Sequence, residues 1–493
     1  MAKKILSIAL ALVFALSMCA AFGEAGKWED EVSHVIMLYL TAGVTPKDLG
    51  EVQDKMNERT IPEIGVEIEL RPVSFFDSAA LFPAWLTNGE VFDLFFPFMQ
   101  DPFSYTSSGS ILPIDEYLTE ENAPHLLALD AEGTGVLSNC VLDGKTWGVQ
   151  PVPKAINGTG GAYIIQKKYV DETGWDYDPE TVYSLDDLGE LFALIAEKFP
   201  DVYPCGIITS GTTDTNFSYT DNVVDPLGSS KVYSGALIGL DGTTIENVFA
   251  TEEYRDFLEH MRAWNLAGYI HPDANVSDSD AYSLMKAGVI TGRFFFNSFG
   301  GIEPDEYMIK LTPIYKKSEA FGGMFLSRTS ANPEAAVRFL DMLWSDVELV
   351  NLLQLGIEGK HWVMLDESIG LIGFPEGVDA NNSGYANPLG LYGDKRQIYV
   401  STPDNTLEEA QVFGAEAISH PTQGVGVAYN GNAVSNELSA VAAVVAQYVP
   451  TLECGAVDID TYLPQFLTAL EAAGIDTIIA DKQAQFDNAV ANR

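Results

Sequence analysis

The stretch VSHVIMLYLTAGVTPKDLGEVQDKMNERTIPEIGVEIELRPVS (residues 32–74) decides the fold class of this chain. Residues 32–43 form an apolar run that is typical of a buried strand. Residues 45–60 place apolar side chains at helical spacing, behind a proline that suits a first helical turn. Residues 66–74 alternate between apolar and polar side chains, as a half-buried strand does. The stretch therefore predicts a strand, a helix and a second strand.

Two further elements continue this order. DSAALFPAWLTNG (77–89) predicts a second helix that stops at a glycine, and FDLFFPF (92–98) predicts a third strand. A β-α-β-α-β order predicts a mainly parallel sheet with helices on both faces. Within the third strand we expect four apolar side chains to be core residues, namely Phe92, Leu94, Phe95 and Phe96.

Aromatic residues stand at two of the three predicted strand ends. Phe75 and Phe76 follow the second strand, and Phe98, Gln100 and Asp101 follow the third. Ligands of open α/β sheets bind beyond the carboxyl ends of strands. Aromatic rings can stack on a flat face of a ligand, and amide or carboxylate groups can form hydrogen bonds with it. We therefore expect these side chains to line a ligand site, with the rings inside the strand left for the core.

Length and charge limit the function classes. A chain of 493 residues is too long for one ordinary core, so we expect two large lobes. It carries 70 acidic and 27 basic residues, a formal net charge of −43. Such a surface repels nucleic-acid phosphates and anionic headgroups, which makes both poor candidates as partners. The simplest reason for the charge is solubility.

The N-terminus predicts export. Residues 1–26 begin with two lysines, continue with an apolar run and end in small residues, which is the pattern of an export signal. The run is shorter than the roughly 20 residues that a membrane span needs. Cys19 follows it, where bacterial lipoproteins carry their lipidated cysteine, although Met18 stands where that pattern wants a small residue. The alternative is ordinary cleavage between Ala21 and Ala25.

The sequence gives no sign of a metal centre or cofactor. Cys140, Cys205 and Cys454 lack metal-ligand spacing, so buried free thiols are favoured, although one pair could form a bridge. No two of the six histidines are spaced as ligands. DANVSDSD (273–280) is similar to a calcium loop but lacks its glycine and its terminal glutamate, which favours a polar turn.

The rest of the chain alternates helices with short strands. SLDDLGELFALIAEKFP (184–200) predicts an amphipathic helix whose cap is Ser184. Further elements are a strand at 202–209, a helix at 250–270, a helix followed by an aromatic strand at 279–301, two helices at 329–363, and a helical end at 428–493.

Several stretches together resemble a known family. In chain order, the first three stretches are FDLFFPF (92–98), ILPIDEYL (111–118) and DGKTWGVQPVP (143–153). The second is similar to the pattern L-x-P-L-D-x-Y-L, and the third is similar to D-G-K-x-Y-G-I-P. They are followed by GAYIIQKKYVDETGWD (161–176), SLDDLGELFALIAEKFPDVYP (184–204) and residues 321–363. The family is that of the extracellular solute-binding proteins of bacterial ATP-binding-cassette importers. The chain resembles its large sugar-binding type, in a Gram-positive lipoprotein subgroup with a distinct C-terminal region. Met18 and Leu185 depart from the family pattern.

The resemblance implies a periplasmic-binding-protein-like fold, in which two α/β lobes joined by a multi-strand hinge hold the ligand in a cleft. We expect an export signal and linker at 1–26, lobe 1 at 27–153, lobe 2 at 154–291, and a return to lobe 1 with the hinge at 292–324. Residues 325–493 are expected to be mainly lobe 2 with C-terminal helices, part of them packing on lobe 1. The implied function is capture of an oligosaccharide outside the cell by a monomer, for delivery to a membrane permease.

The family pattern and the strand ends add further candidate ligand residues. Trp147 and Trp362 are favoured, and the others are Tyr163, Phe217, Tyr219, Asn297 and Phe299. For every ring, the alternative is packing in a core.

Other functions remain open at this stage. A uronate would need a bidentate arginine, for which Arg293 is favoured over Arg71, Arg328 and Arg396. A peptide or another small solute is the further binding alternative. A secreted glycoside hydrolase would need two carboxylates across the scissile bond, and the sequence shows no catalytic motif for one.

Overall fold

The computed structural model describes residues 32–98, 100, 102–155, 158–207, 215–220, 223–224, 232–274, 281–300, 302–316, 322–380, 382–385, 389–402, 406–424, 427 and 429–491. The predicted export signal with Cys19, the candidate Asp101 and most of the 273–280 loop lie outside these residues. The chain divides into unit 1, Met1–Lys154 with Phe321–Leu407, and unit 2, Ala155–Ala320 with Glu408–Arg493.

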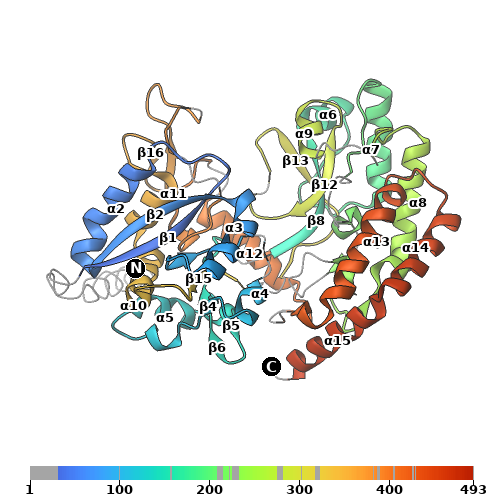
Figure 1. Cartoon of the computed structure of the whole chain (residues 1–493). Helices are drawn as coiled ribbons and strands as arrows, with labels where there is room; N and C mark the ends of the chain where they lie inside the picture. The colour runs from blue at the N-terminus through green and yellow to red at the C-terminus, as the bar shows by residue number, and fades with distance from the viewer. Residues whose placement is uncertain are drawn as a thin grey trace, which may run out of the picture. The chain divides into compact units, whose positions relative to one another are not determined.

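The sheet of unit 1, part of which is labelled in Figure 1, has six strands by its backbone hydrogen bonds. Five lie in the order β2 (Val66–Ser74), β1 (Ser33–Thr41), β3 (Leu94–Phe95), β15 (Met324–Ser327) and β4 (Ile111–Leu112), and β7 (Gly148–Val149) pairs with β15. β1 pairs in parallel with β2 and with β3, so the predicted parallel β-α-β-α-β arrangement is confirmed. β15 returns antiparallel to β3 from more than 200 residues later in the chain.

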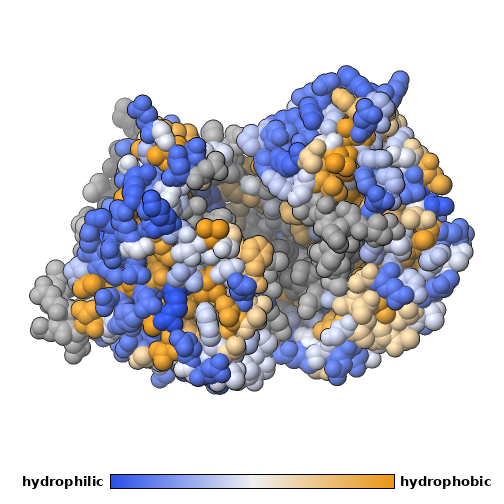
Figure 2. Space-filling model, turned by 45° about the horizontal axis from the view of Figure 1, so that its top comes forward, coloured by the Kyte–Doolittle hydropathy of each residue, from blue (hydrophilic) through white to orange (hydrophobic). Residues whose placement is uncertain are grey.

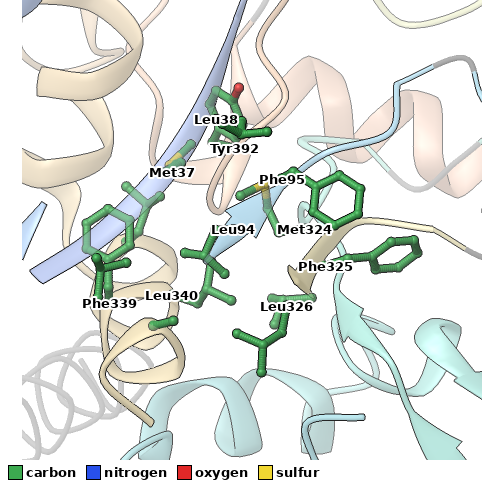
Figure 3. Close-up of a cluster of buried hydrophobic side chains, with 14 of the residues drawn as sticks. Met37, Leu38, Leu94, Phe95, Met324, Phe325, Leu326, Phe339, Leu340 and Tyr392 are labelled. Atoms are coloured by element: carbon green, nitrogen blue, oxygen red, sulfur yellow. The ribbon is translucent and has the colours of Figure 1, made fainter. Parts of the chain in front are cut away.

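Helices bury the faces of this sheet. They are α2 (Leu49–Ile64), α3 (Phe75–Asn88), α4 (Pro102–Ser107), α5 (Pro124–Ala131), α10 (Pro333–Ser345) and α11 (Val347–Leu355). From Val35 to Thr41, β1 is buried at every position, because neighbours cover both its faces. Figure 3 shows the centre of this core, where side chains of β1 and β3 meet those of β15 and α10.

The stretch FDLFFPF divides between core and surface. Phe92, Leu94 and Phe95 have no exposed surface, as predicted, whereas Phe96 is only partly buried. Asp93 is also buried, and its carboxylate accepts hydrogen bonds from the backbone N–H groups of Ile36 (2.7 Å), Ala331 (3.1 Å) and Asn332 (3.3 Å). This acid therefore joins the first strand to the returning segment before α10.

Unit 2 is built around β8 (Gly158–Gln166). β12 (Gly292–Asn297), β13 (Glu306–Lys310) and β14 (Tyr315–Lys316) all pair antiparallel with it. A second sheet contains β9 (Val223–Val224), β10 (Ala236–Ile238) and β11 (Ile245–Glu246). The helices are α6 (Lys167–Thr173), α7 (Leu185–Lys198), α8 (Glu252–Leu266), α9 (Ala281–Lys286), α12 (Leu407–Ser419), α13 (Ser435–Glu453), α14 (Ile459–Ala473) and α15 (Ile475–Ala491).

Two of the predicted domain assignments are wrong. Residues 292–324 were expected to return to lobe 1, but β12 pairs with β8 and the chain enters unit 1 again only at Phe321. Residues 325–407 were expected mainly in lobe 2, but they belong to unit 1, where Trp344 donates to the carbonyl oxygen of Gln150 (2.8 Å). The sequence of an apolar strand does not indicate which sheet the strand joins, because its pairing partners lie far away in the chain.

The surface and the cysteines agree with an acid-rich globular protein. Hydrophilic side chains cover much of the face shown in Figure 2. Cys140, Cys205 and Cys454 are free and buried, which confirms the favoured interpretation. In the part of the chain that the structure describes, none of the helices combines the length and the apolar character that crossing a bilayer requires.

Candidate functional site

Three aromatic rings gather at the carboxyl edge of the unit 1 sheet. Phe75 and Phe76 follow β2, and Phe98 follows β3, which brings them to one edge because these strands are parallel to β1. The ring centroids of Phe75 lie 3.9 Å from Phe76 and 6.1 Å from Phe98. We call these three residues the edge rings.

The edge rings differ in exposure. Phe76 is 71% exposed, while Phe75 and Phe98 are partly buried against the core. Gly43, at the end of β1, has a φ of 91°, and a Cβ there would touch the Phe76 ring at 3.7 Å. A large ring held open to solvent can stack on the flat face of a sugar.

Two other side chains hold the amide group of Gln100 through hydrogen bonds. Its Nε2 donates to Ser78 Oγ (3.0 Å), and its Oε1 accepts from the Tyr105 hydroxyl (2.5 Å). Ser78 in turn donates to the carbonyl oxygen of Phe75 (2.8 Å). Burial raises the pKa of Tyr105 to about 12, which keeps its donating proton in place. Gln100 therefore ties α4 to the start of α3, and the second N–H of its amide donates to no acceptor among the described residues.

The two favoured tryptophans also lie in unit 1. Trp147 is partly buried and donates to the carbonyl oxygen of Leu142 (3.1 Å). Trp362 is 8% exposed, donates to the carbonyl oxygen of Gly356 (3.0 Å) and packs edge-on against Tyr399. Among the described residues, no ring–ring contact joins either indole to the edge rings. Of the two, Trp147 is the more exposed, and the ammonium of Lys145 lies 5.9 Å from its ring centroid.

Unit 2 has its own carboxyl edge. β12 and β13 run in the same direction, since both are antiparallel to β8, so Asn297 and Lys310 end at the edge where β8 begins. The 3-10 turn η3 (Asn216–Tyr219) packs against β8 at Gly161, where any Cβ would collide with the carbonyl group of Tyr219. A glycine is required at this close approach.

Tyr219 meets two rings of β12 there. Its ring centroid lies 4.5 Å from Phe296, edge to face, and 6.2 Å from Phe295. Phe296 is 37% exposed, whereas Tyr219 is 4% exposed. The sequence prediction named Tyr219 but missed Phe296, which it treated only as part of an aromatic strand.

A pocket of about 390 Å³ opens at the same edge, between the first turns of α7 and α8. Its acidic side chains are Asp186, Glu253 and Asp256, and His260 Nε2 lies 3.1 Å from Asp186 Oδ1. The remaining lining residues are Val182, Tyr183, Ser184, Leu185, Phe217, Thr220, Phe257 and Leu311. Carboxylates and hydroxyls above an aromatic floor suit a hydroxyl-rich ligand. Asp186, in the first turn of the helix predicted at 184–200, is not among the predicted ligand residues, because nothing local in the sequence indicates that two helix starts will meet.

The structure places two predicted ligand rings in the core of unit 2. Tyr163 has no exposed surface, and its hydroxyl donates to the carbonyl oxygen of Pro204 (2.8 Å). Phe217 is 1% exposed and packs against Tyr254 and Phe257. Both rings point from β8 and η3 toward the helices of the unit 2 core. The prediction that Tyr163 stacks on a ligand is therefore wrong, whereas Phe217 is both a core residue and part of the pocket lining.

The remaining candidates follow β12. Asn297, at its carboxyl end, is 4% exposed, and its Nδ2 has no hydrogen-bond partner among the described residues. Phe299 packs against Phe413 of α12. Arg293 lies four residues before Asn297, at the amino end of the strand, with its guanidinium carbon 4.9 Å from the Tyr282 ring and 5.0 Å from the Phe295 ring. The structure thus does not bring Arg293 to the ligand edge.

Three carboxylates in the turn before β13 and at its first residue lie close enough to share a cation, and they belong to Glu303, Asp305 and Glu306. The ammonium of Lys286 lies 2.7 Å from Glu303, 3.5 Å from Asp305 and 3.4 Å from Glu306. The positive charge of Lys286 therefore offsets part of the negative charge of these three carboxylates.

Comparisons with known proteins extend these findings. A family model described as a domain of unknown function (DUF3502) matches residues 424–491. A carbohydrate ABC transporter substrate-binding protein of Streptococcus pneumoniae serotype 4 (strain ATCC BAA-334 / TIGR4) is 22% identical over 501 residues, covering 98% of this chain and 97% of that protein.

Solved structures are similar over the same length. The N-glycan transport solute binding protein NgtS of Streptococcus pneumoniae gives a TM-score of 0.77 at 20% identity, covering 93% of this chain and 99% of that chain, and has also been solved with Man1GlcNAc. The S. pneumoniae ABC-transporter substrate binding protein FusA, in complex with kestose, gives 0.68 at 14% identity, covering 94% and 100%. The predicted resemblance is confirmed, and the fold is that of two-lobed solute-binding proteins.

Proposed function

We propose that this protein is the solute-binding subunit of an ABC importer, which captures an oligosaccharide outside the cell and delivers it to a membrane permease. The observation that carries the proposal is Phe76, a ring 71% exposed at the carboxyl edge of the unit 1 sheet, in a chain whose solved relatives include proteins in complex with Man1GlcNAc and kestose. Exposing so large an apolar ring costs solubility and has a purpose where a sugar face covers it.

Each unit supplies its own kind of sugar contact. In unit 1, the edge rings give a stacking surface, and the second N–H of the Gln100 amide, which has no acceptor in the part of the chain that the structure describes, can donate to a hydroxyl. In unit 2, the carboxylates of Asp186, Glu253 and Asp256 accept hydrogen bonds from hydroxyls, while Phe296 gives a partly exposed ring. This set favours a neutral glycan over a uronate, since the pocket brings together acids and Arg293 stays away from the edge.

A thermal-unfolding panel tests the proposal. A chain beginning at residue 27 is unfolded with Man1GlcNAc, kestose, oligouronates and short peptides. A ligand that binds only the folded form stabilises it by about 2.7 kcal/mol at 100 times its dissociation constant. We expect a higher midpoint with a neutral oligosaccharide and none with peptides. A shift with peptides or uronates alone would overturn the assignment to neutral glycans.

The same samples separate binding from hydrolysis. A glycoside hydrolase is the second candidate, because the pocket of unit 2 holds three carboxylates. Chromatography of the glycan after overnight incubation is expected to show the starting sugar intact. Shorter products would make the protein an enzyme.

Export and lipid attachment at Cys19 complete the proposed function, since an importer's binding subunit has to stay beside its permease. Expression of the full chain and of Cys19→Ala in a Gram-positive host tests this. The unchanged chain is expected in the membrane fraction and the variant in the medium. Equal release of both would leave export by ordinary cleavage near Ala21–Ala25.

A further inference from the structure

The last residue of α13, Glu453, is a buried carboxylate without a cation. It has no exposed surface, and among the described residues no lysine, arginine or histidine forms an ion pair with it. Arg262 of α8 donates instead to the carbonyl oxygen of Gly455 (2.6 Å). A buried carboxylate is costly unless hydrogen bonds replace the water it has lost.

Four donors replace that water, and three of them come from one turn. Glu453 Oε2 accepts from the backbone N–H of Asn216 (2.7 Å) and from its Nδ2 (2.9 Å). Oε1 accepts from the hydroxyl of Thr215 and from that of Tyr254 (3.4 Å). Thr215 Oγ1 also accepts from the N–H of Phe217 (3.2 Å). The hydroxyl that the carboxylate fixes is therefore the same hydroxyl that caps the first turn of η3. One acid thus fixes the start of a turn more than 200 residues earlier in the chain.

The turn that Glu453 holds contributes directly to the ligand edge of unit 2. Phe217 and Thr220 line the pocket, and Tyr219 presents its ring to Phe296. The backbone of Tyr219 lies so close to Gly161 that a small shift of the turn would move both the ring and the pocket wall.

We propose that Glu453 is a positioning residue for ligand binding: its carboxylate fixes η3, so that Tyr219 and the wall of the pocket keep the geometry that the ligand needs. The C-terminal region 424–491, matched by a family model without assigned function, thereby acts on the ligand edge. This inference rests on the proposed function, because it assigns a role in binding.

The hold depends on charge. An ionised carboxylate accepts from all four donors, whereas a protonated acid turns one oxygen into a donor that faces donors. Burial raises the pKa of Glu453 to about 7, and the hydrogen bonds from Thr215 and Asn216 oppose that rise. The titratable groups that face it are Tyr254 of α8 and the adjacent Cys454, whose pKa values are both raised, so they stay neutral. Since burial outweighs these hydrogen bonds, the closed turn binds a proton more tightly than an opened turn in which the carboxylate is hydrated, so opening of η3 should become rarer as pH falls through 7.

Hydrogen exchange of η3 tests the positioning directly. The reporters are the amides of residues 216–218 and 220, compared between the unchanged chain and Glu453→Gln at pH 8. We expect about tenfold faster exchange in the variant, the loss typical of a charged hydrogen-bond acceptor. Glu306→Gln, which changes another buried carboxylate of unit 2, is the matched control and should leave these amides unchanged. Equal protection in Glu453→Gln would overturn the proposal.

The pH profile adds a readout that a merely structural residue would not give. After correction for intrinsic rates, exchange of the η3 amides in the unchanged chain should slow between pH 8 and pH 5.5, because protonation of Glu453 favours its buried state, while Glu453→Gln stays level. Parallel profiles would overturn the assignment to Glu453. If Glu453→Gln does not fold, Thr215→Val removes the partner hydroxyl and is judged by the same amides.

Calorimetric titration with Man1GlcNAc and kestose supplies the binding readout. We expect weaker binding in Glu453→Gln, and faster η3 exchange with unchanged affinity would overturn the positioning role. If neither sugar binds the unchanged chain, the proposed function fails for these ligands. The exchange data then still decide separately whether Glu453 holds η3.

Discussion

Phe75 and Phe76 are neighbours in the sequence with ring centroids 3.9 Å apart, yet only Phe75 packs against the core, and Phe76 is left 71% exposed. The chain thus uses one phenylalanine to support the next. Because α3 begins at Phe75, directly after β2, the supporting ring is fixed by the core and the second ring stands beyond the strand end.

Phe76→Ala is expected to weaken oligosaccharide binding without lowering stability. A stacking contact is worth about 1 kcal/mol, so the dissociation constant should rise roughly fivefold, while the exposed ring contributes little to folding. Calorimetric titration and thermal unfolding measure the two effects. Leu266→Ala removes an equally exposed apolar side chain at the end of α8 and should change neither. Unchanged affinity in Phe76→Ala would remove the edge rings from the binding site.

Asp93→Asn is expected to destabilise unit 1. The buried carboxylate accepts from three backbone N–H groups and from the Ser330 hydroxyl, and an amide would turn a donor toward some of these donors. A loss of about 3 kcal/mol is expected from such a network. Urea unfolding measures it, with the exposed Asp54→Asn as control. A loss below about 0.5 kcal/mol would show that the network is replaceable.

His125→Gln should destabilise the protein more at pH 5.5 than at pH 8.5. His125 Nδ1 lies 2.7 Å from Asp341 Oδ2, and this hydrogen bond raises the pKa of the imidazole. A raised folded-state pKa gives stability that is fully present below the unfolded pKa, near 6.5, and is lost as pH rises through the folded value. Because the ring is about one-third exposed, the difference should stay below about 1 kcal/mol.

The control for this pH dependence is His271→Gln, whose ring packs against Tyr203. Urea unfolding of both variants, each measured against the unchanged chain at the same pH, isolates the ion pair from the other carboxylates. A loss in His125→Gln that is equal at both pH values would mean that the imidazole acts by packing alone.

The three thiols of a chain beginning at residue 27 should be inert in the folded state. Burial raises the pKa of Cys140 to about 12 and also raises those of Cys205 and Cys454, so almost no thiolate forms at pH 8. A thiol reagent should titrate none of them within minutes and all three after unfolding. Fewer than three after unfolding would indicate a disulfide, and rapid reaction in the folded state would indicate local opening.

The local helices and strands of the first sheet can be predicted from the sequence alone. The apolar run at 32–43 and the alternation at 66–74 predict β1 and β2, and the helical spacing of Leu49, Val52 and Met56 predicts the buried face of α2. These features follow from periodicity, which local backbone geometry imposes. The sequence placed Phe75, Phe76 and Phe98 together beyond strand ends, but only the structure shows that Phe76 is the exposed ring.

Which strand joins which sheet, and which polar side chains meet, depends on contacts between distant parts of the chain. β12 was predicted correctly as an aromatic strand but placed in the wrong lobe, because the antiparallel partner that it finds, β8, lies more than 100 residues earlier. Tyr163 was predicted as a ligand ring but is a core residue, because the direction of its side chain depends on the strands and helices that pack against β8. The residues around Asp186 and Glu453 come from segments far apart in the chain, and neither stretch of sequence alone indicates that these contacts form.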